Sequence, residues 1–151
     1  MKPGLKLMGD RQLKKLLKSL PDKIQKKVMR AAMKAATKPI QAAAQAKAPQ
    51  QTGTLALSMA NKVKTYNKSR VTVGIIGPKT GFSSESEGKT NVPANYAHLV
   101  EFGHIAADGS RVSPHPFMAP AAEQSESAAL NAMQSKLAAG ITKEAKKAKG
   151  G

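Results

Sequence analysis

One short stretch of the chain gathers side chains that could bind a metal ion or transfer a proton. His98, Glu101 and His104 lie three residues apart, and His115 follows. Imidazole and carboxylate groups are common zinc ligands. Helical zinc sites, however, place two histidines four residues apart on one face, as in His-Glu-x-x-His, and the spacing here differs. Gly103 is also expected to end a helix before His104. The spacing therefore argues against a metal site.

Other catalytic arrangements are also missing from the sequence. Ser58, Ser83 and Ser113 lack the Gly-x-Ser-x-Gly context of a nucleophile elbow. The glycine-containing stretch 77–88 lacks the Gly-Lys-Ser/Thr of a phosphate-binding loop. The sequence therefore predicts no catalytic, cofactor-binding or metal-binding residues, and we expect a protein that is not an enzyme and needs no cofactor.

Glu101 is the one acidic residue in an apolar setting, between Val100 and Phe102. Such a carboxyl can act as a general acid when its pKa is raised. It can equally accept backbone N–H bonds or pair with a basic side chain. Structural partners perturb carboxylates as well, so perturbation alone does not indicate catalysis. We favour the structural interpretation.

The N-terminal half of the chain reads as two helices. Asp10 is a plausible N-cap for a helix over 11–20, which Pro21 ends. A second helix is predicted over 22–47, because alanines and larger apolar residues recur at helical spacing. Ala48-Pro49 ends it. A basic stripe runs along this second helix, formed by Lys23, Lys26, Lys27, Arg30, Lys34 and Lys38.

The middle of the chain changes to a period of two. After a short helical turn over 55–59, alternation predicts antiparallel strands over 60–67 and 69–76. Residues 77–94 have no apolar periodicity, which predicts a mobile loop.

A short helix over 96–102 then ends at Gly103, and Asp108-Gly109 predicts a hairpin turn. A last helix is expected over 119–139, with Gly140 just beyond it and a basic tail over 141–151. The predicted fold is a single α+β domain over 1–151. It has long N-terminal helices, a small antiparallel β-sheet built from hairpins, a C-terminal helix, and an ordered core over about 10–140.

The apolar content is small for a chain of 151 residues. Only 27 residues are Leu, Ile, Val or Phe, and the net charge is +16. Since each fully buried large apolar side chain contributes roughly 1.5–3 kcal/mol, so poor a core is marginal alone. We therefore expect the protein to bury surface against other subunits. The absence of cysteine is typical of a reducing cytoplasm, and no signal peptide or membrane-spanning run is expected.

The charge is concentrated in the first half of the chain, where 17 of the 25 basic and two of the nine acidic residues lie within 1–75. Twenty-one of the basic residues are lysines, which neutralise phosphates without reading bases. An alternative interpretation is therefore a small lysine-rich protein that binds nucleic acid independently of sequence. The chain has no tryptophan to stack on single strands. The helix over 22–47 also lacks the Trp, Phe and Leu of a membrane-surface helix, so no membrane partner is expected.

Three motifs in a fixed order carry a resemblance to a known family. They are Thr52-Gly53-x-Leu55-x-x-Ser58, Tyr96-Ala97-x-x-Val100-Glu101-Phe102-Gly103, and Pro116-Phe117-x-x-Pro120-Ala121. In this order the chain resembles the neck proteins of long-tailed phages, the head–tail joining, tail-completion or minor tail-component family. The resemblance implies a structural α+β subunit, made in the host cytoplasm and assembled in the virion neck as a homo-oligomeric ring, a hexamer by family likeness. Such a ring would complete the tail top and join the tail to the DNA-filled head.

The resemblance also suggests partners and contact residues. Expected partners are the phage connector and the tail-terminator or tail-tube proteins, and non-specific contact with genomic DNA in the channel stays open. Candidates for the subunit interface are Tyr96, Glu101, Phe102, Gly103, Pro116 and Phe117. The basic stripe of the second helix is the candidate for facing DNA or an acidic partner. Three features depart from the family pattern: His104, the pair Met118-Ala119, and the insertion over 80–90.

Overall fold

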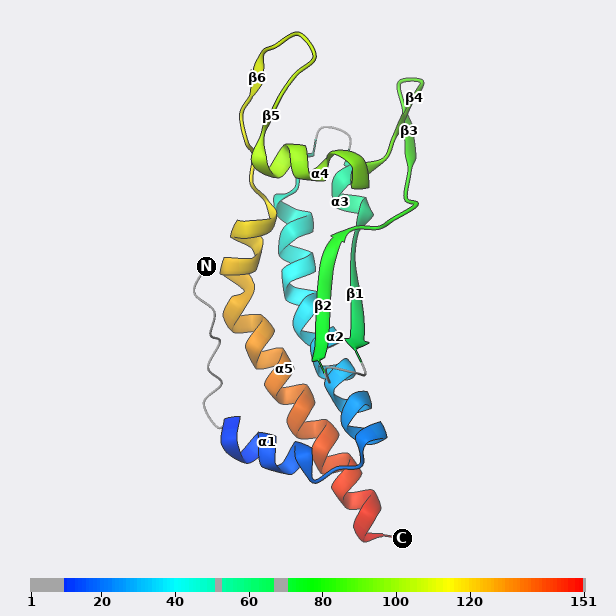
Figure 1. Ribbon diagram of the computed structural model, residues 1–151, viewed down its shortest axis with the longest axis vertical. Coiled ribbons are helices and arrows are strands. Elements are labelled where there is room, and N and C mark those ends of the chain that lie inside the picture. The colour runs from blue at the N-terminus through cyan, green and yellow to red at the C-terminus, as the bar shows by residue number, and fades with distance from the viewer. Residues whose placement is uncertain (1–9, 51–52, 67–70, 151) are drawn as a thin grey trace.

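Two long antiparallel helices form the body of the protein in the computed structural model, which describes residues 10–50, 53–66 and 71–150 (Figure 1). They are α2 (Asp22–Lys47) and α5 (Met118–Lys149), and they pack along most of their length. Residues four apart form a ridge on a helix surface, and small side chains on such ridges let two backbones approach closely. The buried ridges are Val28, Ala32, Ala36 and Ala44 on α2, and Ala121, Ser125, Ala129, Leu137 and Ile141 on α5.

Helix α5 is longer than the sequence pattern predicts. The expected end at Ala139, with Gly140 beyond it, is wrong, because the helix continues to Lys149. A Cβ atom on Gly140 would lie 2.9 Å from a methyl group of Val28. Gly140 therefore serves close packing against α2 rather than helix termination. Ile141, assigned to a tail by the sequence pattern, is only 7% exposed.

The other predicted helices are present with small shifts in their bounds. Helix α1 (Asp10–Lys18) lies across one end of the α2–α5 pair and contacts α5 (Figure 1). Asp10, predicted as the N-cap, is the first helical residue. Helix α2 has the bounds that the sequence predicts and continues through Pro39, whose ring nitrogen has no hydrogen to donate to the preceding turn.

A β-hairpin packs on α2 at a separate face from α5. The short helix α3 (Thr54–Ser58) leads into β1 (Met59–Tyr66), which pairs antiparallel with β2 (Val71–Pro78). The sequence predicts these strands over 60–67 and 69–76. The hairpin connection that it predicts at Asn67-Lys68-Ser69 lies outside the described residues. Gly74 faces α2 so closely that a Cβ atom there would lie 2.5 Å from Cγ2 of Thr37.

The segment predicted to be a loop over 77–94 contains two further strands. They are β3 (Ser84–Ser86) and β4 (Lys89–Asn91), which form an arm at one end of the molecule (Figure 1). Next come α4 (Pro93–Phe102), β5 (His104–Ile105) and β6 (Arg111–Val112). The sheet material among the described residues is therefore three separate two-stranded sheets. The predicted α+β class, with long helices and small hairpins, is confirmed.

The core consists of two clusters of buried residues that lie at different positions along the α2–α5 pair. One lies near α3 and α4 and contains Ala44, Ala48, Leu55, Met59, Phe117 and Ala121. The other lies near α1 and contains Val28, Ala32, Leu137 and Ile141. Three of the six residues in the first cluster are alanines and the second cluster has only four buried residues, so the core is as thin as the composition suggests.

Candidate functional site

The carboxylate of Glu101 caps the start of α5. Its Oε2 accepts hydrogen bonds from the backbone N–H groups of Phe117 at 2.8 Å and Met118 at 2.9 Å, and Oε1 accepts from Ala119 at 3.0 Å. The next residue, Pro120, has no N–H group. All the free donors of the first turn are therefore satisfied by one side chain, which a buried helix end requires.

The charge of Glu101 suits this position. The side chain is 8% exposed, and burial disfavours the charged form. The hydrogen bonds from Met118, Phe117 and Ala119 outweigh the burial and hold the pKa of Glu101 below its usual value. The positive end of the helix dipole also favours a negative charge here. The structural interpretation of Glu101 is confirmed.

Residues 103–116, between α4 and α5, form a segment that we call the finger. Two more contacts hold its base against the rest of the protein. The backbone N–H of His115 donates to the carbonyl of Val100 at 2.7 Å. Directly after the finger, Phe117 is completely buried in the cluster near α3 and α4. The base of the finger is thus fixed to the body on both sides.

Gly103 begins the finger in a conformation that other residues rarely adopt, with φ of 73°. A Cβ atom here would lie 2.6 Å from the carbonyl oxygen of Val112 and 2.8 Å from the nitrogen of Pro114. Space and backbone angle both demand glycine. This explains physically why glycine follows Glu101-Phe102 in the motif.

The tip of the finger is a tight turn held by a side chain. Oδ1 of Asp108 accepts hydrogen bonds from the hydroxyl of Ser110 at 2.6 Å and from its backbone N–H at 2.9 Å. These bonds, that of the hydroxyl first, lower the pKa of Asp108. The N–H of Ala106 also donates to the carbonyl of Ser110 at 2.8 Å. The predicted hairpin at Asp108-Gly109 is confirmed.

The structure divides the predicted interface residues into an internal and an external group. Glu101 and Phe117 are buried inside the subunit, and Tyr96 is half-buried against the core, where burial raises its pKa. Phe102 and Pro116 are exposed, Phe102 to 78%. The internal group therefore supports the surface that the external group presents.

Sequence reasoning missed several exposed apolar side chains at this end of the molecule. Leu57 on α3 is 74% exposed, and Ile105 and Val112 on the finger are also exposed. Their signal is weak, because each lies in an element of five residues or fewer, where periodicity cannot assign a face. Figure 1 places α3, α4, β5 and β6 at the same end of the molecule, which we call the finger end. Together with Phe102, these residues give the finger end several exposed apolar side chains.

The opposite end of the molecule is basic. Five of the six predicted residues on α2 are exposed: Lys23, Lys27, Arg30 and Lys34 toward this end, and Lys38 past the middle of the helix. Helix α5 adds lysines that sequence reasoning placed in a tail, and two of its lysines, Lys136 and Lys143, line a groove of about 230 Å³ together with Lys27. Segments 10–34 and 136–150 contain 14 basic and three acidic residues. We call these two segments, which include α1, the basic end.

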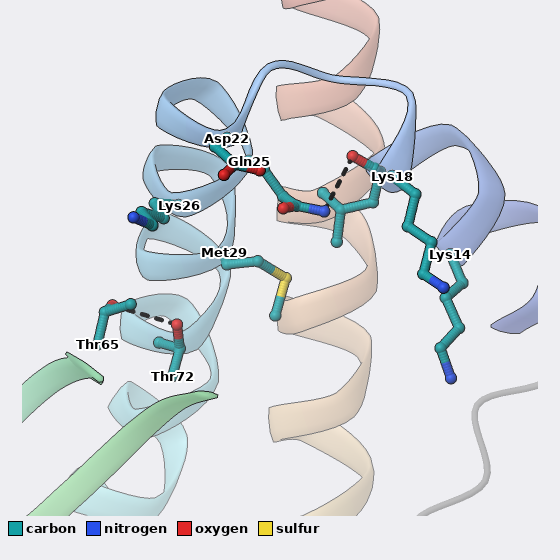
Figure 2. Close-up of a pocket in the computed structure, with 9 residues that line it drawn as sticks. Lys14, Lys18, Asp22, Gln25, Lys26, Met29, Thr65 and Thr72 are labelled. Atoms are coloured by element: carbon teal, nitrogen blue, oxygen red, sulfur yellow. Dashed lines mark hydrogen bonds between the residues drawn. The ribbon is translucent and has the colours of Figure 1, made fainter. Parts of the chain in front are cut away.

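A second hollow at the basic end lies between α1, α2 and the end of the β1–β2 hairpin where Thr65 pairs with Thr72. Figure 2 shows Lys14, Lys18 and Lys26 around this hollow of about 260 Å³. Gln25 donates from Nε2 to the carbonyl of Leu17 at 3.3 Å, which ties α1 to α2. Lys26, the sixth predicted residue, is half-buried here.

The described residues hold neither a metal-ligand cluster nor a membrane-spanning helix. They contain no group of three or more His, Cys, Asp or Glu side chains that could hold a metal ion. Both oxygens of Glu101 already accept backbone hydrogen bonds, and Nδ1 of His104 is buried with no hydrogen-bond partner among the described atoms. No described helix is long and apolar enough to cross a bilayer.

Comparison with known proteins gives one match. The model of the HK97-gp10-like family, described as "Bacteriophage HK97-gp10, putative tail-component", matches residues 11–103. This range covers more than half of the chain and runs from α1 to Gly103. Neither a curated protein nor a solved structure matches.

Proposed function

The chain belongs to the HK97-gp10-like family of phage tail components, and from this premise we propose that it forms a ring in the neck of a long-tailed phage. The family makes it a structural bacteriophage protein of the virion, which assembles with other phage structural proteins. The finer proposal is that the ring completes the top of the tail and joins it to the DNA-filled head. In this role the protein is structural rather than catalytic.

The observation that carries the proposal is the exposed Phe102 on a braced support. An aromatic side chain exposed to 78% is unfavourable in an isolated protein, and aromatic residues are enriched at protein interfaces. Phe102 lies between Glu101, which caps α5, and Gly103, which has no room for a side chain. Such rigid support limits the entropy cost when a partner binds. We assign the finger end to contact with a neighbouring neck or tail protein.

The poor core supports assembly into a ring. A subunit whose buried core is half alanine gains stability when a partner binds only the folded state. Closed rings use heterologous contacts, in which two different surfaces of one subunit meet. A hexamer is the stoichiometry that the family resemblance suggests.

The basic end is assigned to a polyanion. In a neck ring this is either the genomic DNA in the channel or an acidic surface of the next ring. Lys27 of α2 lines one groove together with Lys136 and Lys143 of α5 and a single acidic residue, Glu144, so the two helices share a mainly positive surface there. Lysine side chains of this kind attract phosphate without reading sequence.

The test is assembly of phage particles with the Phe102→Ala variant. We expect full heads and separate tails that fail to join, because the variant lacks the aromatic ring but keeps the Glu101 cap. Leu16→Ala is the matched control, since Leu16 is 53% exposed but lies on α1 at the other end. Normal yield of joined particles with Phe102→Ala would refute the assignment of the finger end.

The alternative function is sequence-independent nucleic-acid binding by the isolated protein. The observation that favours it is the basic end, with 14 basic against three acidic residues. This function predicts tight duplex binding by the monomer at physiological salt, with affinity that falls steeply as salt rises. It also predicts that the protein is absent from purified virions. Detection of the protein in virions by mass spectrometry would exclude it as the main role.

A further inference from the structure

The outer face of the β1–β2 hairpin, turned away from α2, carries a row of apolar side chains. On β2, Val71, Val73 and Ile75 are exposed to 47%, 36% and 43%. The opposite face of this strand carries Gly74, which lets the strand lie against Thr37 of α2. Ile76 on the inner face packs against the core, but the strand leaves Val71, Val73 and Ile75 turned to solvent, which is unfavourable for a lone subunit.

This face is also positively charged. Lys62 pairs with Ile75 and Lys64 pairs with Val73 across the hairpin, so both ammonium groups belong to the outer face. The sequence of the whole hairpin, 59–78, contains no acidic residue. A hollow of about 400 Å³, lined by Lys62, Ile75 and Lys79, adjoins the face where the hairpin meets α3. The complementary surface must therefore be acidic and rich in small or apolar groups.

The first half of α5 has this chemistry. Glu123 and Glu126 are exposed there, and no lysine or arginine occurs on α5 before Lys136. The neighbouring exposed residues, Ala119 and Ala122, are small enough to admit another backbone. Neither glutamate forms an ion pair with another described residue. In a chain of net charge +16, this exposed acidic helix surface is unusual.

The outer hairpin face and the first half of α5 lie at the same height along the long axis of the molecule and point in different directions. The hydroxyl of Ser125 on α5 donates to the carbonyl of Pro39 on α2, and Gly74 on the hairpin touches Thr37, two residues away on α2. Since α5 and the hairpin pack on different faces of α2, their outer surfaces diverge (Figure 1). One copy can therefore offer its hairpin while its α5 receives the hairpin of another.

We infer that the outer hairpin face of one copy docks on the first half of α5 of the next copy. Lys62 and Lys64 then face Glu123 and Glu126, and the three apolar side chains of β2 cover the alanines of α5. The contact is heterologous, as ring closure demands. This inference rests on the proposed ring, because it specifies the contact by which the ring closes.

Cross-linking of the full chain tests the contact, and the absence of native cysteine makes every thiol in the experiment an introduced one. In a chain carrying both Val73→Cys and Ala122→Cys, a short thiol cross-linker should join many copies into a ladder. Either substitution alone permits at most dimers. The matched control pair combines Val73→Cys with Ala42→Cys, which places the second thiol on an exposed alanine of α2.

Charge reversal adds a second readout in the same Val73→Cys/Ala122→Cys background. Lys62→Glu with Lys64→Glu should weaken formation of the ladder about tenfold, since two exposed ion pairs become two repulsions. Adding Glu123→Lys and Glu126→Lys to the same chain should restore it. A rescue of this kind cannot come from a failure to fold.

Three results would overturn the inference: an equal ladder with the Ala42→Cys control, cross-linking through Val73→Cys alone, or no cross-linking at millimolar concentration. The second result would indicate a two-fold dimer through the hairpin. All three leave the proposed place in the virion standing, because that is tested separately, by detecting the protein in virions and by the joining of Phe102→Ala particles.

Discussion

Glu101 shows how a single side chain can organise the finger end of the protein. Its carboxylate satisfies three backbone donors that begin 16 residues later in the chain. Hydrogen bonds to a charged group are stronger than neutral ones, and buried donors without a partner are costly. The stability of α5, of the finger and of the Phe102 support therefore depends on one residue.

We predict that Glu101→Gln lowers the free energy of unfolding by about 2 kcal/mol, because the neutral amide offers one acceptor oxygen and places N–H groups against backbone donors. Urea denaturation followed by circular dichroism measures the change. Glu123→Gln is the control, since Glu123 is exposed on α5 and should change stability by less than about 0.5 kcal/mol. Equal stability of the two variants would contradict the capping role.

The pH dependence of stability should report the same carboxylate. The folded pKa of Glu101 lies below its ordinary value, so the folded state favours its ionised form. Its contribution is therefore fully present above the unfolded pKa and disappears as pH falls through the folded pKa. We expect wild type to lose its advantage over Glu101→Gln in thermal unfolding as pH falls from neutral through and below the ordinary glutamate pKa of about 4.3. Asp108 is also ionisable, but both proteins contain it, so its titration cancels in the comparison. A constant difference across this range would exclude an ionised cap.

At the scale of elements, local patterns in the sequence predict helices and hairpins correctly but fail where tertiary contact decides. Helix α2 and the finger turn at Asp108-Gly109 follow from periodicity and turn chemistry, and both are present. The local sequence predicts that the helix ends at Gly140, because glycine is common just after the C-terminus of a helix. Its actual reason, contact with Val28, depends on a residue 112 positions away and is invisible in a local window.

The candidate site is predictable to a similar degree. The motif containing Glu101 and Phe102 is visible in the sequence, and the structural role of Glu101 follows from its apolar neighbours. The exposure of Val71, Val73 and Ile75 could not be foreseen, because alternation in a strand shows that two faces exist but not which one is buried. Gly74 decides that face, through its fit against Thr37.

We predict that Ile141→Ala destabilises the protein by about 3 kcal/mol, because Ile141 belongs to the buried cluster at the basic end. Ile105→Ala is the matched control, since Ile105 is 66% exposed and its truncation should cost less than about 0.5 kcal/mol. Chemical denaturation of the two variants measures both values. If Ile141→Ala were neutral, residues from 141 onward would be a tail after all.

At the scale of the whole molecule, the two ends differ in chemistry. The finger end and helix α1 lie at opposite ends of the long axis (Figure 1). The finger end presents exposed apolar side chains, and the basic end concentrates positive charge from α1, α2 and α5. A subunit with such polarity has a defined direction along its long axis. In a virion it can meet an apolar protein surface at one end and a polyanion at the other.

We predict that the lysines of α5 contribute to duplex DNA binding at low salt. Replacing Lys143, Lys146 and Lys147 by alanine should reduce the slope of log affinity against log salt by about 0.9 for each phosphate that the variant no longer neutralises. The control replaces Lys62, Lys64 and Lys89, which removes the same charge elsewhere. Fluorescence anisotropy with a short duplex measures both slopes. Equal slopes would mean that net charge alone governs binding.

The hydrogen bonds that Glu101 and Val100 accept have a further consequence for how this protein can vary. These bonds hold the base of the finger, so the fold of the body does not depend on the residues between Gly103 and His115. A stretch clasped in this way can be lengthened or exchanged while the helix pair keeps its shape. Related phages could thus adapt this protein to different neighbouring proteins by exchanging the sequence of the finger, while the rest of the fold stays the same.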